Sequence, residues 1–452
     1  MKIVVVGCGK IGSEIVKSLT EEEHIVTAID NDQSVIDDLS NIYDVMGVCG
    51  NGMDCDVLTE AGVKDAEMFI AATSTDELNM LSCYLAKKMG AKNTIARIRN
   101  PEYTLKSIGF LRQQLGLSLI INPEMLAALE MFNILKLPSA VKIQTFSVRN
   151  FEIIELIVKE GSQLTGVKLY ELRNKFKAKF LICVVRRGNK VYIPDGNFVL
   201  HAGDKIGLTA ELSEIQKLMR SLGMSKKQAK SIMILGGGRI AFYLAKMLIG
   251  AGNSVKIIEQ DDEKCSELSD SLDKAMIIHG DGAQQELLLE EGIESTDAFV
   301  SLTGMDEENI LISIFASAQG VPTVITKVNR NELADMASKL GLDCVISPKE
   351  TVSDVLVQYA RALENSRGSN VETLYNIMDG MAEVLEFKVR SDFGYAGIKL
   401  KDLRLKPNIL VAGIIRDRKP IIPTGDDVIL GNDKVIILAA DQRLNDLSDI
   451  IK

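Results

Sequence analysis

Residues 1–12 read MKIVVVGCGKIG, and this stretch predicts how the rest of the chain folds. An apolar run at residues 3–6 is followed at once by Gly7-x-Gly9-x-x-Gly12. A buried strand, a glycine-rich turn and the start of a helix, in this order, are typical of the first unit of a doubly wound parallel sheet. The first glycine permits a tight turn, the second lets the backbone approach a phosphate, and the third lets the helix pack on the strand. We therefore expect a phosphate-binding βαβ unit here.

An acidic residue strengthens this interpretation. Asp30 follows the glycine motif at the end of the next apolar run. A carboxylate there can accept hydrogen bonds from ribose hydroxyls and would repel a 2′-phosphate, so the pattern favours NAD over NADP. Lys10 comes directly after the second glycine. It could pair with a phosphate, or it could be a solvated residue of the first helical turn.

The same pattern returns in the second half of the chain. Residues 230–241 read KSIMILGGGRIA, and Glu259 follows Ala241 at the same spacing at which Asp30 follows Gly12. Further residues match at a nearly constant separation: Thr73, Asp76 and Asn79 with Thr303, Asp306 and Asn309, and the triplet 50–52 with 280–282. Matches of this regularity indicate a tandem duplication of a unit that spans about half the chain. Alanine at the third position leaves the occupancy of the second site open.

Each unit divides into two predicted domains. Apolar runs at 3–6, 25–29, 45–49, 68–71 and 94–98 alternate with helical patterns such as 12–20 and 76–89. This alternation predicts a parallel sheet covered by helices. After about residue 140, strand-like runs at 151–158, 181–186 and 205–209 are separated by turn residues, which predicts a small α+β module. The fold class is thus α/β, with two Rossmann-like doubly wound domains, each followed by a small α+β domain. The predicted domains are 1–137, 138–223, 224–362 and 363–452, with joints at Pro138 and at the polar stretch 224–230.

Composition excludes several classes of protein. The 452 residues are 46% hydrophobic and 25% charged. These values are ordinary for a folded chain. A net charge of −10 without a basic block argues against a nucleic-acid partner. Seven cysteines without a C-x-x-C pair indicate neither a disulfide framework nor a zinc site. No apolar run approaches the roughly 20 residues of a membrane-spanning helix.

Catalytic motifs are lacking, so we expect a binding protein rather than an enzyme. The chain has three histidines and neither H-E-x-x-H nor G-x-S-x-G, and we predict no catalytic residue and no metal ligand. Thr73, Ser74 and Asp76 follow the fourth strand, where they could face a nucleotide or cap the next helix. Arg97 could bind a ligand, bridge domains or form a surface ion pair. Three classes of protein remain as alternatives. They are an NAD-dependent oxidoreductase, a redox-sensing transcription factor and a regulator of a cation channel or antiporter.

The motifs together resemble tandem members of the RCK (regulator of K+ conductance) family, the regulatory subunits of Trk-type potassium uptake systems. The residues that carry the resemblance are the glycine loop with Asp30, the segment 50–52, the segment 72–79 (ATSTDELN) and the segment 95–103 (IARIRNPEY), and the resemblance covers all 452 residues. It implies a cytoplasmic protein, peripheral on the inner face of the cell membrane. This protein would assemble into a homo-oligomeric ring, a tetramer by expectation, beneath a Trk-type membrane potassium-translocating subunit.

The resemblance also implies the ligands and the residues that bind them. NAD(H), or ATP and ADP at the same sites, would bind the Rossmann-like domains and gate the transporter. In the first repeat the implied residues are Gly7, Cys8, Gly9, Lys10, Ile11, Gly12, Asp30, Asn51, Thr73, Ser74 and Arg97. In the second repeat they are Gly236, Gly237, Gly238, Arg239, Ile240, Glu259, Asp281 and Thr303. Lys327 and Asn329 replace Arg97 and Arg99, which again leaves the second site in question.

Overall fold

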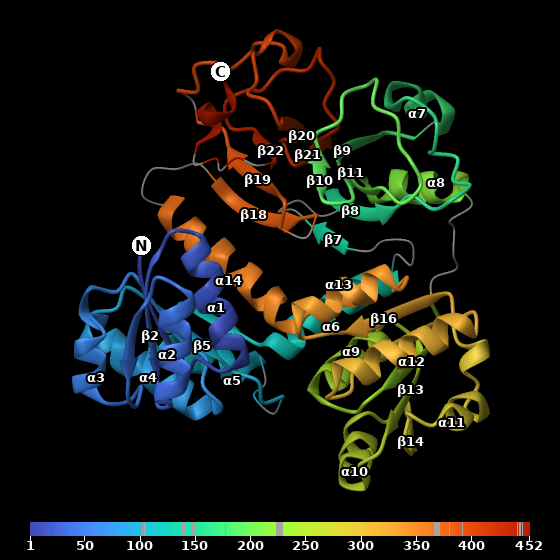
Figure 1. The fold of residues 1–452 in the computed structure, drawn as a ribbon. Helices are drawn as coiled ribbons and strands as arrows, with labels where there is room; N and C mark the ends of the chain where they lie inside the picture. The colour runs from blue at the N-terminus through green and yellow to red at the C-terminus, as the bar shows by residue number, and fades with distance from the viewer. Residues whose placement is uncertain are drawn as a thin grey trace. The chain divides into compact units, whose positions relative to one another are not determined.

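The structure of the chain is a computed structural model. It describes residues 1–101, 103, 105–136, 142–145, 151–176, 178–222, 229–342, 344–365, 371–378, 380–390, 392–440, 442, 444 and 446–452. The contacts within the chain divide it into two compact units. Figure 1 labels many of the helices and strands that make up these units. The first unit comprises residues 1–131 and 230–360, and the second comprises residues 132–229 and 361–452.

A six-stranded parallel sheet forms the first half of the first unit, in the order β3-β2-β1-β4-β5-β6. Its strands are β1 (Lys2–Val6), β2 (Ile25–Asp30), β3 (Met46–Cys49), β4 (Met68–Ala71), β5 (Asn93–Arg97) and β6 (Leu119–Ile121). Its helices are α1 (Lys10–Glu21), α2 (Gln33–Ile42), α3 (Cys55–Glu60), η1 (Val63–Asp65), α4 (Asp76–Met89), α5 (Leu105–Leu115) and α6 (Pro123–Lys136). This order is that of a doubly wound fold, whose ligand site lies where the order reverses, between β1 and β4.

The strands of this sheet are short and almost wholly apolar because helices cover both faces. Residues 3–6 of β1 are buried, as is all of β4. One core cluster includes Val4, Phe69 and Leu58. The expected strands and the helix at 76–89 are confirmed. The strand β6 was not expected, since its three residues are too few to show a periodic pattern.

The second half of the first unit repeats this architecture, with the order β14-β13-β12-β15-β16-β17. Its strands are β12 (Ser231–Leu235), β13 (Ser254–Glu259), β14 (Ala275–His279), β15 (Ala298–Ser301), β16 (Thr323–Lys327) and β17 (Cys344–Ile346). Its helices are α9 (Arg239–Gly250), α10 (Asp262–Ser271), α11 (Gln285–Glu290), η2 (Ile293–Ser295), α12 (Asp306–Ala318), α13 (Asn331–Lys339) and α14 (Pro348–Asn365). The duplication inferred from the residues is therefore visible strand by strand.

The second unit contains two five-stranded antiparallel sheets with matching orders, β10-β9-β11-β8-β7 and β21-β20-β22-β19-β18. The first has β7 (Lys142–Thr145), β8 (Phe151–Ile157), β9 (Phe180–Arg187), β10 (Lys190–Tyr192) and β11 (Lys205–Glu211), with α7 (Leu169–Phe176) and α8 (Leu212–Ser221). The second has β18 (Val371–Ile377), β19 (Ala382–Lys388), β20 (Ile409–Arg416), β21 (Lys419–Ile421) and β22 (Lys434–Ala440), with η3 (Leu400–Asp402) and η4 (Leu447–Ile450).

The two antiparallel sheets share one hydrophobic core, in which Val184 of β9 and Leu438 of β22 belong to the same cluster. The hydroxyl of Thr209 also donates to the carbonyl of Ala412, at 3.0 Å. The predicted joint at Pro138 and most of the predicted linker, residues 224–228, lie outside the described residues. Across the described ranges, no helix combines the length and the hydrophobicity needed to cross a bilayer.

Candidate functional site

The loop between β1 and α1 has the backbone that its glycines predict. Gly7 has a φ of +84°, and a Cβ there would lie 2.6 Å from the backbone N of Thr73. A Cβ at Gly12 would lie 1.9 Å from the carbonyl oxygen of Gly7, so this glycine lets α1 pack against the loop. At Gly9, by contrast, a Cβ would meet nothing within 4 Å. Gly9 is also the N-cap of α1 and makes no side-chain cap. This open side therefore presents the N–H groups of a helix start, an environment that favours an anion.

Asp30 holds the glycine loop in place. Its Oδ2 accepts a hydrogen bond from the backbone N–H of Cys8 at 2.6 Å, and its Oδ1 accepts one from Asp32 at 3.0 Å. The side chain is half-buried. Because an ionised carboxylate offers about four acceptor positions, Asp30 keeps capacity for the hydroxyl donors of a ribose.

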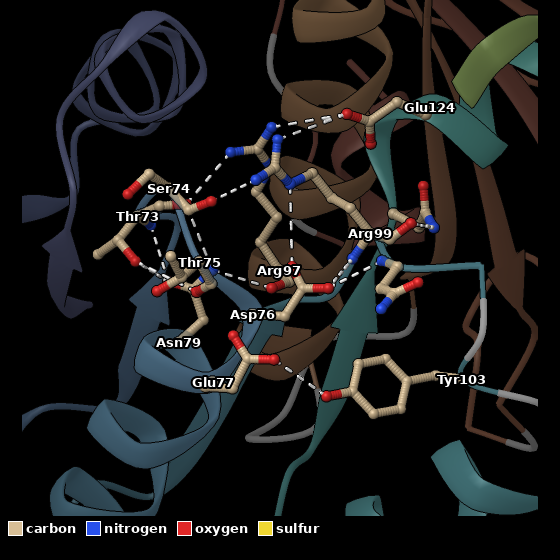
Figure 2. Close-up of polar contacts among 12 residues, drawn as sticks. Thr73, Ser74, Thr75, Asp76, Glu77, Asn79, Arg97, Arg99, Tyr103 and Glu124 are labelled. Carbon is tan, nitrogen blue, oxygen red and sulfur yellow. Dashed lines mark hydrogen bonds and ion pairs between the residues drawn. The ribbon is translucent and has the colours of Figure 1, made fainter. Parts of the chain in front are cut away.

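A buried amide ties together the carboxyl ends of β4 and β5 (Figure 2). Asn79 on α4 is fully buried, and its Oδ1 accepts hydrogen bonds from the N–H and the hydroxyl of Thr73, each at 2.7 Å. Its Nδ2 donates to the carbonyl of Arg97 at 2.9 Å. Asn309 repeats this arrangement in the second copy, with Thr303 N–H at 2.8 Å and the carbonyl of Lys327 at 3.1 Å. Asn79 thus positions two loops that line the site.

Asp76 does not cap the helix that it begins. The N-cap of α4 is Thr75, which makes no side-chain cap. The Oδ2 of Asp76 instead accepts hydrogen bonds from the N–H groups of Arg99 and Asn100, at 2.9 and 2.8 Å. Of the two alternatives for Asp76, the helix cap is therefore wrong, because the loop after β5 supplies donors that compete for this carboxylate; Asp76 also does not line the larger cavity described below.

Two arginines and one glutamate meet beside this network, as Figure 2 shows. Arg97 and Arg99 both approach Oε1 of Glu124, at 3.8 and 3.9 Å, and Arg99 also donates to the carbonyl of Ser74. Burial lowers the pKa of Arg97, and the neighbouring Arg99 lowers it further. An arginine nevertheless stays protonated at neutral pH. With Asp76, whose Oδ1 lies 3.8 Å from Nε of Arg99, the cluster holds two guanidinium groups and two carboxylates in a partly desolvated place, where electrostatic interactions are strengthened.

These elements surround a cavity of about 1140 Å³. From the first repeat it is lined by Val6, Gly7, Gly9, Lys10, Ile11, Ile29, Asp30, Asn31, Gly50, Asn51, Gly52, Met53, Ala72, Thr73, Ser74, Leu78, Arg97 and Arg99. From the second repeat it is lined by Gly304, Met305, Asp306, Glu307, Asn329, Arg330, Pro348 and Lys349. All of these residues belong to the first unit.

The second glycine loop has a much smaller cavity, of about 280 Å³. It is lined by Gly238, Arg239, Ile240, Ala241, Leu302, Lys327 and Asn329, together with Ile11, Pro123, Glu124 and Pro348. Gly236 has a φ of +92°, so the turn itself matches that of Gly7. The two loops therefore have similar backbone conformations, but the cavities beside them differ in volume.

The predicted site residues fall into three groups, all within the described part of the chain. Nine line the larger cavity, namely Gly7, Gly9, Lys10, Ile11, Asp30, Asn51, Thr73, Ser74 and Arg97. Three line the smaller cavity, namely Gly238, Arg239 and Ile240. Seven line neither, namely Cys8, Gly12, Gly236, Gly237, Glu259, Asp281 and Thr303. Cys8 is an inert thiol, because burial and the charge of Asp30 raise its pKa to about 12.

Sequence reasoning missed the residues that the repeats contribute to each other's cavities. Glu124 and Lys349 each follow a proline at the start of a helix, in the corresponding segments 122–124 and 347–349. The recurring proline is the one signal that could have drawn attention to these positions. Among the described residues, no group of three or more His, Cys, Asp or Glu side chains is placed to hold a metal ion.

Comparisons with known proteins show which domains the chain contains. The model of the TrkA-N domain matches residues 3–123 and 232–348, and the TrkA-C domain matches residues 153–223 and 384–452. The "Trk system potassium uptake protein TrkA homolog" of Archaeoglobus fulgidus is 33% identical over 100% of both chains. The "Trk system potassium uptake protein TrkA" of Vibrio alginolyticus is 30% identical over 98% of this chain and 96% of its own.

Solved structures share the fold. A structure described as the GsuK RCK domain has a TM-score of 0.63 at 18% identity, and the match covers 97% of this chain and 92% of the other. The structure named "GsuK channel bound to NAD" has a TM-score of 0.62 over 97% of this chain and 77% of the other. The relatives are named as potassium uptake proteins, in agreement with the prediction that the chain is not an enzyme. With both domain types present twice and a relative that matches from end to end, the chain belongs to the TrkA family of Trk-system potassium uptake proteins.

Proposed function

We propose that this chain is a regulatory subunit that senses a nucleotide and thereby gates a Trk-type potassium transporter. The observation that carries the proposal is the larger cavity, in which an open glycine loop, an acceptor for ribose hydroxyls and several cations face one another. Its volume of about 1140 Å³ suits a ligand of dinucleotide size.

The residues present fit an adenine nucleotide. Asp30 would accept hydrogen bonds from the ribose, and the start of α1 with Lys10 would hold the first phosphates. Arg97 and Arg99 would attract charge beyond them. NAD(H), ADP and ATP share the adenosine diphosphate portion that these residues would bind, so each is a candidate ligand. Neighbours of the same fold named as GsuK bound to NAD and GsuK bound to ADP support this set of ligands.

Regulation would follow from linkage between binding and conformation. A ligand shifts an equilibrium between two conformations only by its difference in affinity for them. The larger cavity has walls from both repeats, so a nucleotide there would favour the arrangement of the repeats that fits it best. NADH and ATP differ in length and in phosphate charge beyond the diphosphate, and they would therefore favour different arrangements.

The partner would be a Trk-type membrane subunit that conducts potassium, because the relatives are named for that uptake system. We place the chain at the inner face of the cell membrane as a peripheral protein, assembled into a homo-oligomeric ring, with a tetramer as the expected form. The function is thereby one of control, since the partner supplies the path for the ion.

Co-purification and flux measurements test this proposal. A tagged chain is expected to retain a Trk-type membrane subunit, and potassium flux through the reconstituted pair should change when ATP, ADP, NAD and NADH are compared. An unrelated cation antiporter serves as the control partner. A potassium flux that is the same with and without each of the four nucleotides would contradict the proposal. Sustained oxidation of NADH in the presence of a small carbonyl compound would favour the oxidoreductase alternative instead.

A further inference from the structure

The two glycine loops differ most in the acid that follows them. Asp30 is half-buried and accepts two backbone N–H groups, whereas Glu259 is 8% exposed. The Oε2 of Glu259 accepts from the N–H of Gly237 at 2.6 Å, and its Oε1 accepts from Gln260 and Asp261 at 2.9 and 3.0 Å. The longer side chain folds back onto its own turn. The protein therefore takes three of its roughly four acceptor positions, against two in Asp30.

The residue inside each loop has changed together with the acid. Cys8 stands in the first loop, and Gly237 stands at the same place in the second. A Cβ at Gly237 would lie 2.6 Å from Cδ1 of Leu268 and 3.0 Å from Oε2 of Glu259. A side chain at this position would therefore force Leu268 to shift, because Glu259 and Leu268 occupy the space. Glu259, which is almost fully buried, is absent from the lining of the smaller cavity.

The wall opposite each loop carries opposite charge. The start of α14 brings Lys349 to the larger cavity, whereas the start of α6 brings Glu124 to the smaller one. The smaller cavity has two cations in its lining, Arg239 and Lys327, against one acid, Glu124, which Arg97 and Arg99 already approach. The larger cavity instead has five cations in its lining, Lys10, Arg97, Arg99, Arg330 and Lys349, against three acids, Asp30, Asp306 and Glu307.

We propose that each chain binds one nucleotide rather than two, in the first repeat, and that the second repeat serves as a wall of that single site. The inference rests on the proposed function, since it concerns the same cavity. Burial of Glu259 narrows the adenosine end of the second site, and a cavity of about 280 Å³ leaves little room at its phosphate end. Duplication has thus produced one composite site from two loops.

A matched pair of substitutions tests the inference in the full-length chain. Gly9 and Gly238 are both N-caps with φ of −65° and −70°, and a Cβ at either would meet nothing within 4 Å. Aspartate suits such a position and improves the cap, so Gly9→Asp and Gly238→Asp should both fold. Each places a carboxylate where a phosphate would bind its own loop.

Equilibrium dialysis with radiolabelled ADP, after nucleotide removal, gives stoichiometry and affinity. We expect the unmodified chain to bind one ADP. The affinity for ADP should fall at least tenfold in Gly9→Asp and should change less than about twofold in Gly238→Asp. Two ADP per chain, or a tenfold loss in Gly238→Asp, would overturn the inference and leave the proposed function standing. If the unmodified chain bound none of ADP, ATP and NADH, the proposed function itself would be refuted. Melting temperatures of both variants verify folding.

Discussion

The two glycine loops of this chain share a backbone but differ in their surroundings. Gly7 and Gly236 have nearly the same positive φ, yet the cavities beside the loops measure about 1140 and 280 Å³. Beside the second loop, the longer side chain of Glu259 is buried and Leu268 packs close to Gly237. A duplicated fold can therefore retain every strand while the cavities beside its loops differ in size, because sheet packing and cavity lining depend on different residues.

The largest expected effect concerns a feature that both repeats keep. Asn79→Ala removes the only side chain in the described structure that joins the N–H of Thr73 to the carbonyl of Arg97, and leaves these partly buried backbone groups without that partner. We expect the ends of β4 and β5 to lose about 3 kcal/mol of local stability. Hydrogen exchange at the amides of β5 measures this loss, and Asn309→Ala should have the same effect on β16.

Ser82→Ala is the control for that experiment. Ser82 is buried on the same helix, and in the described structure its hydroxyl has no hydrogen-bond partner. Removing an unsatisfied hydroxyl should leave protection unchanged or raise it. If Asn79→Ala were as harmless as Ser82→Ala, the amide would not be positioning the site.

The second effect concerns an arginine–aspartate ion pair that occurs at the same place in both antiparallel sheets. Arg187 donates to both oxygens of Asp204 at 2.7 and 2.8 Å, and Arg416 binds Asp433 likewise at 2.9 and 2.7 Å. Burial alone would raise the pKa of Asp204, but hydrogen bonds from Arg187 and from the His201 N–H outweigh it and lower the pKa below its usual value. Breaking the pair by Asp204→Asn should cost about 2 kcal/mol at pH 7, less than for a fully buried pair because the arginine is partly exposed.

The sign of the pH dependence follows from that lowered pKa. Stability from Asp204 is present above the unfolded-state pKa of about 4 and is lost as pH falls through the lower folded-state value. Melting temperature should therefore drop between about pH 5 and pH 2 in the unmodified chain and drop less in Asp204→Asn. A steeper drop in the variant would contradict the assignment.

The third effect concerns the position where the loops themselves differ. Gly12→Ala places a Cβ against the carbonyl oxygen of Gly7. The required backbone shift should cost about 2 kcal/mol. The reverse change, Ala241→Gly, should cost only about 1 kcal/mol, through helix propensity. Thermal unfolding measures both, and ADP affinity should fall in Gly12→Ala alone.

The sequence predicted best what depends on local patterns. The span of α4, the strands around the glycine loops and the duplication all follow from periodicity and spacing, which are properties of neighbouring residues. The role of Asp76 could not be predicted, because its partners, the N–H groups of Arg99 and Asn100, lie far from it along the chain. Lys349 was missed because its role depends on the packing of one repeat against the other, which no pattern within a repeat encodes.

The smallest effect concerns two contacts between the repeats. They involve equivalent positions, Glu14 on α1 and Tyr243 on α9. On α1, Glu14 accepts from Lys349 at 2.9 Å, whereas on α9 the hydroxyl of Tyr243 donates to the carbonyl of Arg99 at 3.0 Å and accepts from Asn122 at 3.0 Å. Tyr243→Phe should therefore cost about 1 kcal/mol at any salt concentration, as expected for neutral hydrogen bonds. Lys349→Met should cost a similar amount in dilute buffer but less in about 1 M NaCl, because salt screens the ion pair. Melting temperatures at both salt concentrations measure this, and an equal salt response of the two variants would show that charge does not distinguish the two walls.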